Sequence, residues 1–573
     1  MKKTILLILV LLSVTTFGQN NATSFDWSFN GGAGVNSTSR LNYNSQGDLL
    51  FLMEIWHQTI YGGTPISEPA FFGNPGITSF IGKRTQSGVS SVVVKVNSPN
   101  TTGTTFQDFV IDSNDNIIVA GTTFSTDLTQ FYDFGNGITL YGKGNFIAKF
   151  NPQGVCLWAN LINYNITNGN ASENKNLGLG VLPNNDIYFA NRSTNGAKPF
   201  WLIKYNTAGT EIWHKEWIIT NSNSIAILTS KNNFFFDNTG KAYFYISSAS
   251  GELVTADGIT LTPPAGTYPS TVSLLTINND GSNDLFTTYR GIISDIAVEK
   301  ATGNVLFGWQ QYGQNPAPFN TLPIDVAGGN SFSGIIALDP NRNLINYSSQ
   351  FNSQNGTGSI FPVGNLNFIS NARISPGGTL TIPNQTFTAT KYTPTWRFYQ
   401  NFTFSKFIAH PELNGNNSTS YNLMAIYNNK LAVSGTYRLV NNATIVVNGT
   451  TLISCGNDPN FATLYPNFVS QQGDVFISQL TIDPSFLAVN SLEILSNFTI
   501  YPNPASNNLN LKLENYIENA SLKIISITGQ VVFEKQNLSG TEFNFDVSNL
   551  NSGLYIVQIR DLDQKLNSKF IKQ

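Results

Sequence analysis

The sequence predicts an all-β protein, with a β-propeller of about seven blades followed by a small Ig-like β-sandwich. Three observations favour this fold. Two short β-type elements alternate along most of the 573 residues, glycine is frequent (48 residues), and charged residues become denser only near the C-terminus. All-β repeats that each supply about four strands, separated by Gly and Asn turns, are typical of propeller blades.

The composition excludes several other classes of protein. Hydrophobic residues make up 41% of the chain and the formal net charge is −3, so the chain is too apolar and too weakly charged to be disordered. No excess of basic residues is present to attract nucleic acid or an anionic membrane, and we expect no nucleic-acid partner. Two cysteines are too few for a disulfide framework or a cysteine zinc site. We expect no cofactor and no bound metal.

The first 18 residues have the three parts of a secretory signal peptide. Met1-Lys2-Lys3 is cationic, residues 5–14 are mainly apolar, and Gly18 is a small residue close to the expected cleavage point. The apolar run has about ten residues, whereas a membrane-spanning helix needs about 20. We therefore expect residues 1–18 to be removed during export and the mature chain to hold no transmembrane segment.

The first repeated element is a lysine-bearing strand, a turn and a tryptophan strand. Residues 146–158 and 201–213 place Lys, Asn, Gly and Trp at identical offsets, so that Lys149 matches Lys204 and Trp158 matches Trp213. Weaker copies centre on Asn97, Asn278, Asp339, His410 and Asp483.

The second repeated element is a polar hairpin turn that leads into an apolar strand. It occurs at residues 45–51, 112–121, 184–189, 238–244 and 302–307, with degenerate copies at 376–380 and 428–433. The two elements alternate strictly, and there are seven of each. Seven blades are therefore expected, with six or eight as alternatives because the later copies are loose. A single blade cannot bury both of its faces, so neighbouring blades must stack and the ring must close.

The N-terminal strand is expected to close that ring. Residues 25–28, which include Trp27, precede the first polar hairpin much as Trp158 and Trp213 precede theirs. This strand would supply the fourth strand of the last blade, whose earlier strands lie near Asp483. Pairing the two ends in one blade would protect the sheet edges. The alternative is that residues 487–495 complete the last blade.

A second domain is predicted from residue 498. About 18% of residues 498–573 are charged, against about 10% of the residues before them. Short alternating strands are expected at 509–513, 522–527, 531–533, 543–547 and 553–559, which is typical of a small antiparallel sandwich. The predicted organisation is a signal peptide at 1–18, a propeller at 23–490, a linker at 491–497 and the sandwich at 498–573.

Four stretches of this last domain carry a family resemblance. They are residues 501–505 (Tyr-Pro-Asn-Pro-Ala), 527–531 (Ile-Thr-Gly-Gln-Val), Leu550 with 553–555 (Gly-Leu-Tyr), and 569–572 (Lys-Phe-Ile-Lys). In order, spacing and terminal position they resemble the type A C-terminal sorting domain of the type IX secretion system of Bacteroidota. The resemblance implies recognition by an outer-membrane translocon, removal of the tail on export, and release or attachment at the cell surface. The sorting-signal residues that it assigns are Tyr501, Pro502, Asn503, Pro504, Gly529, Gly553, Leu554, Tyr555 and Lys569. An ordinary Ig-like module that stays in the mature protein is the alternative.

The repeats themselves resemble the β-propeller repeats of large secreted Bacteroidota proteins. Their blades carry a hairpin, a glycine-rich loop, a lysine strand and a tryptophan strand in that order, and the matching loops are residues 133–140 and 256–261. The resemblance is clear over residues 25–310 and weak beyond them. It implies an architecture and says little about activity.

Catalytic and metal-binding patterns are scarce in this sequence. His57, His214 and His410 are far apart and have no partner at a ligand or triad spacing. Cys156 takes the place of Glu211 in the repeat, so it is expected to pack as a small hydrophobe or to lie on a blade face, and a bridge to Cys455 is not expected.

Two acidic patterns bear on metal binding and catalysis. The Asp112 loop lacks the glycine and the glutamate that an EF-type calcium loop needs, so a polar hairpin turn is the better interpretation. Paired carboxylates could meet in a propeller channel; Glu54 is the one glutamate in an apolar strand beside an aromatic residue, although it is more simply a solvent-facing strand residue.

These observations predict an exported, non-catalytic propeller that binds a protein or glycan. Delivery would use the Sec route and then the type IX machinery. The mature protein would be secreted or attached to the outer-membrane surface. A secreted polysaccharide hydrolase or lyase that uses the channel is the alternative. Trp158 and Trp213 are expected to pack between blades and not to form a sugar platform.

Overall fold

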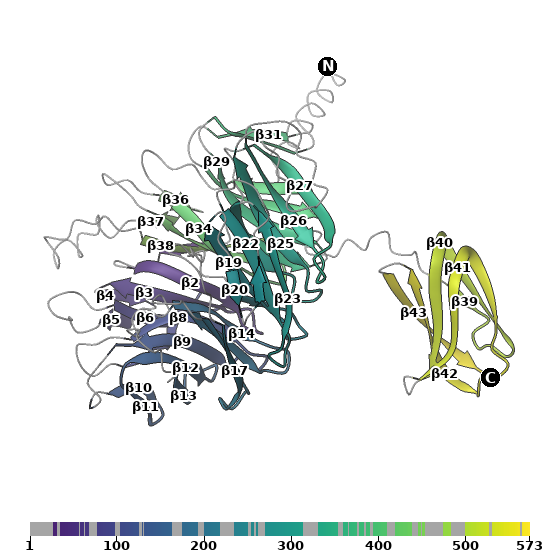
Figure 1. The fold of residues 1–573 in the computed structure, drawn as a ribbon, viewed down its shortest axis with the longest axis horizontal. Coiled ribbons are helices and arrows are strands. Elements are labelled where there is room, and N and C mark those ends of the chain that lie inside the picture. Colours follow the sequence, from purple (N-terminus) through teal and green to yellow (C-terminus); the bar gives the residue numbers. More distant parts are fainter. Residues whose placement is uncertain are drawn as a thin grey trace, which may run out of the picture. The chain divides into compact units, whose positions relative to one another are not determined.

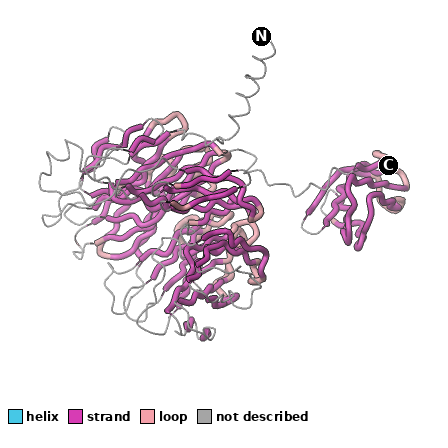
Figure 2. The backbone as a smooth tube through the Cα atoms, turned by 90° about the horizontal axis from the view of Figure 1, so that it is seen from above, coloured by secondary structure: helices cyan, strands magenta, loops and turns pink. Residues whose placement is uncertain are grey.

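The computed structural model describes residues 27–30, 35–56, 58–61, 64–67, 77–97, 104–124, 129, 131–162, 175–192, 200–217, 234–249, 254–256, 259–261, 270–290, 292–312, 331–352, 359–364, 366–374, 377–382, 385–389, 393–409, 419–437, 445–447, 450–452, 474–482, 499–526, 530–561 and 564–573. These residues are strands and loops, with no helix among them (Figure 2). The chain divides into two compact units, Met1–Leu487 and Ala488–Gln573, and each is described by itself.

The first unit holds seven four-stranded antiparallel sheets within its described residues, here called blades 1 to 7. Blade 1 is β2 (Val35–Tyr43), β3 (Leu49–Trp56), β6 (Ile77–Arg84) and β7 (Ser90–Val94). Blade 2 is β8 (Thr104–Ile111), β9 (Ile117–Thr123), β12 (Gly144–Phe150) and β13 (Cys156–Ile162). Blade 3 is β14 (Lys175–Val181), β15 (Ile187–Arg192), β16 (Phe200–Tyr205) and β17 (Glu211–Trp217).

The remaining blades follow the same plan. Blade 4 is β18 (Phe234–Phe236), β19 (Ala242–Ala249), β22 (Ser270–Ile277) and β23 (Asn283–Arg290). Blade 5 is β24 (Ile292–Val298), β25 (Val305–Tyr312), β26 (Ser331–Leu338) and β27 (Leu344–Asn352). Blade 6 is β28 (Ile360–Gly364), β29 (Asn367–Ile374), β32 (Thr393–Gln400) and β33 (Thr403–Ala409). Blade 7 is β34 (Thr419–Tyr427), β35 (Lys430–Tyr437), β38 (Asp474–Thr481) and β1 (Trp27–Asn30).

The ring closes through the N-terminal strand, as predicted. β1 pairs antiparallel with β38, with Trp27 opposite Gln479, and so becomes the fourth strand of blade 7. From blade 1 to blade 6 the first strands of successive blades contact one another, and β2 contacts both β8 and β34. Strands from the two ends of the propeller sequence therefore lie side by side, purple beside green in Figure 1. The structure confirms a seven-bladed propeller.

The polar turns of the second repeated element join the first and second strands of a blade. In blade 2 the Asp112 carboxylate accepts hydrogen bonds from the backbone N–H groups of Asn114 and Asn116, at 2.9 Å each. Asp115 adopts a φ of 60°, which Asp and Asn tolerate better than most residues. This side-chain chemistry explains why Asp and Asn recur at these turns.

The first repeated element joins one blade to the next. The Lys149 ammonium lies 2.8 Å from the Asp112 carboxylate of its own blade and donates to the Thr207 hydroxyl of blade 3 at 2.7 Å. Trp158 donates through Nε1 to the Thr207 carbonyl oxygen at 3.2 Å. Its ring covers Gly209, where a Cβ atom would lie only 2.6 Å from the indole.

The same joint recurs between blades 3 and 4. Lys204 lies 3.2 Å from Asp186 and donates to the Asn279 side-chain oxygen at 2.7 Å, while Trp213 donates to the Asn279 carbonyl oxygen at 3.1 Å. The two tryptophans thus pack at equivalent positions between blades, as the repeat predicted.

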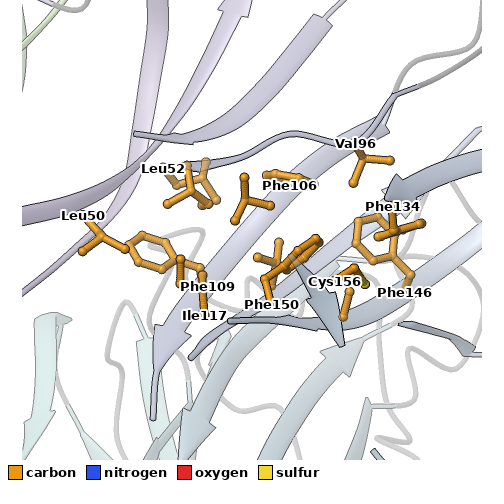
Figure 3. Packing of buried hydrophobic residues seen from close by; sticks show 14 of the residues in the cluster. Leu50, Leu52, Val96, Phe106, Phe109, Ile117, Phe134, Phe146, Phe150 and Cys156 are labelled. Atoms are coloured by element: carbon orange, nitrogen blue, oxygen red, sulfur yellow. The ribbon is translucent and has the colours of Figure 1, made fainter. Parts of the chain in front are cut away.

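Among the described residues, five blades show an extra two-stranded hairpin between their second and third strands. The hairpins are β4 (Gln58–Tyr61) with β5 (Thr64–Ser67), β10 (Phe131–Gly135) with β11 (Ile138–Tyr141), β20 (Val254–Ala256) with β21 (Ile259–Leu261), β30 (Thr379–Ile382) with β31 (Gln385–Thr388), and β36 (Ile445–Val447) with β37 (Thr450–Leu452). The blade 2 hairpin is part of the core, because Phe134 packs edge-on against Phe146 with ring centroids 5.0 Å apart (Figure 3). The glycine-rich loop at 133–140 is therefore the hairpin that extends the core of blades 1 and 2.

Three of the predicted repeat copies were misplaced. The third-to-fourth-strand turn of blade 1 lies at 85–88, and Asn97 instead pairs with Asp133 of the hairpin that follows β9. In blade 6 that turn lies at 401–402, and His410 falls outside the described residues. Residues 379–382 form β30 of an extra hairpin, whereas the first turn of blade 6 lies between β28 and β29. The number of blades was right because each misplaced copy had a true copy nearby.

The second unit is a sandwich built from two long strands that bend between its two layers. β40 (Asn508–Ser526) and β41 (Val531–Asp546) pair along both layers. β39 (Thr499–Tyr501) pairs with the first part of β40, and β42 (Gly553–Asp561) with β43 (Gln564–Lys572) extends from its second part. Leu509, Leu522, Val557 and Phe570 belong to one buried core between the layers. This confirms the predicted small sandwich, although two of its strands are much longer than the sequence pattern indicated.

Candidate functional site

The first sorting-signal stretch crosses from β39 to the edge of β43. Tyr501, Pro502, Asn503 and Pro504 are exposed, while Ala505 is completely buried. The Asn503 side chain donates to the Lys569 carbonyl oxygen (3.2 Å) and accepts from the Ile571 N–H (2.9 Å). Its amide group therefore pairs with β43 as a peptide group of a neighbouring strand would.

Ala505 continues this pairing along the last residues. Its N–H donates to the Ile571 carbonyl oxygen at 2.8 Å, and its carbonyl oxygen accepts from the Gln573 N–H at 2.9 Å. Together Asn503 and Ala505 satisfy the outward-facing backbone groups of β43 from Lys569 to Gln573, which would otherwise be an open sheet edge. The structural role of Ala505 was not predicted. Its position between the proline-containing turn and the next strand could have indicated that its backbone pairs with a neighbouring strand.

The other sorting-signal residues divide between core and surface. Tyr555 is buried and its hydroxyl donates to the Asn551 carbonyl oxygen at 2.9 Å, whereas its neighbour Leu554 is 43% exposed. Gly553 begins β42, and Lys569 is exposed on β43, opposite Ile556. Gly529 lies outside the described residues. The structure thus brings Leu554 and Lys569 onto neighbouring strands and places Asn503 against the edge of the second.

In the propeller, the first strands of blades 1 and 2 carry an ion pair. Arg40 Nε lies 3.0 Å from Asp108 Oδ1, and Arg40 Nη1 donates to the Leu179 carbonyl oxygen at 3.3 Å. Asp108 Oδ2 accepts from the Leu179 N–H at 2.9 Å. Both side chains therefore bind the first strand of blade 3, and the ion pair joins three blades.

Asp295 occupies the position of Asp108 in blade 5. It accepts from the Ile360 N–H of blade 6 at 2.6 Å, and burial raises the pKa of its carboxyl group to about 7. Glu299, also buried, accepts from the Leu366 N–H at 2.6 Å and from the side chains of Thr302 and Asn304. These two acids hold blade 6 against blade 5.

Lys300 of blade 5 lies against an aromatic ring of blade 4. Its ammonium lies 4.7 Å from the centroid of the Phe236 ring of blade 4. Desolvation of the ammonium group, and then the nearby positive charge of Arg40, lower the pKa of Lys300 to about 8.

The histidines, Glu54 and the cysteines were the residues considered for catalysis. Those that the structure describes lie in strands. His214 is exposed and its Nδ1 lies 2.6 Å from Glu211, while His57 and His410 lie outside the described residues. Glu54 is half-buried in β3. Cys156 is a free, fully buried thiol in the blade 1–2 core, where burial raises its pKa to about 11; Cys455 lies outside the described residues.

The Asp112 loop is a hairpin turn, as predicted. Burial acts to raise the pKa of Asp112, but hydrogen bonds from Lys149 and Asn116 outweigh it and hold the pKa below its ordinary value. The carboxylate is fully used by these partners. Among the described residues, no group of three or more His, Cys, Asp or Glu side chains is arranged to hold a metal ion.

One group of aromatic side chains is exposed on blade 2. Phe124 (37% exposed) follows β9, and Phe131 (39%) and Tyr141 (51%) face each other across the β10–β11 hairpin with ring centroids 6.0 Å apart. The Phe124 N–H donates to the Tyr132 hydroxyl at 3.0 Å, which ties the end of β9 to this hairpin. No repeat or motif in the sequence marks these three residues. Successive side chains of a strand point to opposite faces, and Tyr132 and Phe134 are buried. This alternation could have predicted that Phe131 is exposed.

Comparison with known proteins identifies the second unit. Residues 499–573 match the family model of the secretion system C-terminal sorting domain. The chain therefore carries a type IX sorting tail, which indicates export by the type IX machinery to the cell surface or the medium. No curated protein sequence matches the chain.

Solved structures give weak overall likenesses. A mutant of the Synechocystis apocarotenoid oxygenase aligns with a TM-score of 0.33 and 10% identity, over 68% of this chain and 93% of that one. The endosialidase of phage phi92 aligns with a TM-score of 0.27 and 8% identity, over 80% of this chain and 69% of that one. Within the described residues, no helix has the length and hydropathy to cross a membrane.

Proposed function

We propose that the propeller is a non-catalytic domain that binds a protein or a glycan outside the cell. Its route would be the Sec pathway, with removal of residues 1–18, followed by type IX export directed by the C-terminal domain. The mature protein would then be released or held at the outer-membrane surface.

The state of the buried acids supports this proposal. The buried carboxylates among the described propeller residues are Asp108, Asp112, Asp237, Asp295 and Glu299. Each one accepts hydrogen bonds that hold a turn or join two blades. A glycosidase needs two carboxyl groups free to reach one substrate bond, and these five are committed to the fold.

The aromatic group Phe124, Phe131 and Tyr141 is the part of the described surface best suited to binding. Aromatic side chains are enriched at recognition surfaces because they offer a large, rigid contact area with little loss of conformational entropy. The hairpin that carries Phe131 and Tyr141 is anchored by its buried face, so their positions are set before a ligand arrives.

The test is a co-sedimentation assay of the purified full chain with insoluble cellulose, chitin and xylan, together with an assay for released sugars. We expect retention on at least one polysaccharide without sugar release, and about two- to ten-fold weaker retention for Tyr141→Ala. The control is Leu157→Ala, because Leu157 is similarly exposed (47%) but lies on β13. Sugar release that survives in Tyr141→Ala would instead support the hydrolase or lyase alternative.

A further inference from the structure

The two outward faces of the sorting domain differ in chemistry. On the layer formed by β39, the first part of β40 and the end of β41, charged and amide side chains form exposed cross-strand pairs, and Tyr501 lies opposite Asn510. Lys512 lies opposite Glu542 with an ion pair of 2.7 Å, and Asn544 donates to Asn510 at 2.6 Å. This is the usual pattern for an antiparallel sheet with one face on the core and the other in water.

The other layer breaks that pattern. On its outward face Val531 lies opposite Ile525, and Ile525 lies opposite Ile556, so three branched apolar residues form one row across β41, β40 and β42. In the next row Leu554 lies opposite Ile571 across β42 and β43. We call these five residues the apolar stripe. Val531, Leu554 and Ile571 are 43%, 43% and 49% exposed, and the alternate residues Tyr555, Val557 and Phe570 fill the core.

Polar groups border the stripe on its own face. Lys569 is exposed at one end of the first row, opposite Ile556. On the far side, Lys523 pairs with Glu534 at 3.4 Å and lies opposite Gln558. An exposed apolar surface with a polar rim is typical of a protein-interaction site.

The stripe also collects sorting-signal stretches that are distant in the sequence. Val531 belongs to the 527–531 stretch, Leu554 to the 553–555 stretch, and Ile571 with Lys569 to the 569–572 stretch. The remaining stretch, 501–505, is bonded to the backbone of Lys569 and Ile571 and so fixes the strand that carries them. We infer that the apolar stripe is the surface by which the export machinery recognises this domain, and that its partner is a protein with an apolar surface and an acidic group opposite Lys569. This inference rests on the export function of residues 499–573.

The first experiment compares matched double variants of the full chain in a bacterium that has a type IX secretion system. Leu554→Ser with Ile571→Ser removes the exposed cross-strand pair of the stripe, and Lys512→Ser with Glu542→Ser removes an exposed cross-strand pair of the polar face. The fraction of the protein outside the cell is measured by immunoblot. We expect at least about a ten-fold loss of export for the stripe variant and wild-type export for the polar-face variant. Normal export of the stripe variant would overturn the inference.

A deletion of residues 499–573 separates this inference from the export function itself. If the deletion variant is still exported, the sorting function fails; if it is retained while the stripe variant is exported, only the stripe fails. Thermal unfolding of both double variants shows whether their sorting domains are folded.

If the stripe variant is unfolded, photo-crosslinking decides. A photoreactive amino acid is placed at position 554 or, as the control, at position 544 on the polar face, and adducts formed in living cells are identified by mass spectrometry. We expect an adduct with a component of the secretion machinery from position 554 and none from 544. Equal adducts from both positions, or none from 554, would overturn the inference.

Discussion

Blades 2 and 3 are joined by a lysine and a tryptophan in addition to the Asp108 carboxylate, whereas blades 5 and 6 are joined by the two buried acids Asp295 and Glu299. Lys149 reaches Thr207, and Trp158 covers Gly209. Asp295 and Glu299 instead accept the backbone N–H groups of blade 6 at 2.6 Å each. Both joints use an acid at the equivalent position of the first strand, and the lysine and tryptophan contacts are added between blades 2 and 3, where the sequence repeat is clear.

The largest expected effect comes from breaking the lysine joint. Lys149→Met should lower the free energy of unfolding of the propeller by about 3–5 kcal/mol, because Asp112 would stay buried without its cation. The measurement is urea unfolding of the full chain, following the propeller transition.

The control for this effect is Lys241→Met. The Lys241–Asp284 pair has a similar distance, 2.9 Å, but both side chains are partly exposed, so its loss should cost about 1 kcal/mol or less. Equal losses of unfolding free energy in the two variants would show that the buried Lys149–Asp112 pair stabilises the propeller no more than an exposed pair does.

The carboxyl joint should give the propeller a pH dependence. The pKa of Asp295 rises from 3.8 to about 7 on folding, so the folded state binds the proton more tightly than the unfolded state. Stability contributed by this proton is present below about pH 4 and is lost as pH rises through about 7. Asp295→Asn keeps an acceptor for the Ile360 N–H and has no proton to lose. Its unfolding free energy relative to the wild type should therefore improve between pH 5 and pH 8 by a few kcal/mol, at about 1.4 kcal/mol per pKa unit.

Asp108→Asn provides the comparison for that experiment. Asp108 has the Arg40 guanidinium at 3.0 Å, so the substitution removes an ion pair and should destabilise the propeller at pH 5 and at pH 8 alike. If the unfolding free energies of the two asparagine variants, relative to the wild type, change equally between pH 5 and pH 8, then Asp295 does not differ from Asp108 in its protonation.

The propeller could be predicted from the sequence because its turns and joints use recurring side chains. The ring closure followed from Trp27, since a tryptophan strand was missing from the last blade, and β1 fills that place. Blade 6 was located poorly because Leu366 and Phe402 adopt positive φ beside Gly364 and Asn401 in its turns, and such bulky residues do not indicate a turn in the sequence. The buried acids Asp108 and Asp295 each stand four residues before the acid of their hairpin turn, Asp112 or Glu299, so this spacing was the signal that could have found them.

The sorting domain was predicted from its motifs, but the structural roles of the individual motif residues were not. Asn503 was assigned to the signal, yet its contact with β43 depends on a register that the sequence does not reveal. The apolar stripe was missed for a simpler reason. Leu554, Tyr555, Ile556 and Val557 form an unbroken apolar run, and only the fold decides which two residues face the core.

The smallest expected effect tests the tryptophan and glycine contact by itself. Gly209→Ala should destabilise the propeller by about 1–3 kcal/mol, because the new Cβ would lie 2.6 Å from the Trp158 ring. Gly137→Ala controls for backbone strain, since Gly137 has a similar φ (74° against 80°) but nothing within 4 Å of its Cβ position. The difference between the two variants in urea unfolding therefore isolates the ring contact, and a difference near zero would contradict it.

The equivalent turn of blade 5 has a side chain where blade 3 has Gly209. There Arg342 holds the position of Gly209 at a φ of 73°, and the residue matching Trp158 in blade 4 is Leu285. The Arg342 guanidinium lies 5.5 Å from the centroid of the Tyr243 ring, whereas in blade 3 the equivalent Tyr188 packs 5.9 Å from Trp213. A side chain at the turn is therefore tolerated where the tryptophan is absent. Replacing the tryptophan of blade 2 by the residue type found in blade 4, as Trp158→Leu, should accordingly reduce the cost of Gly209→Ala toward that of Gly137→Ala.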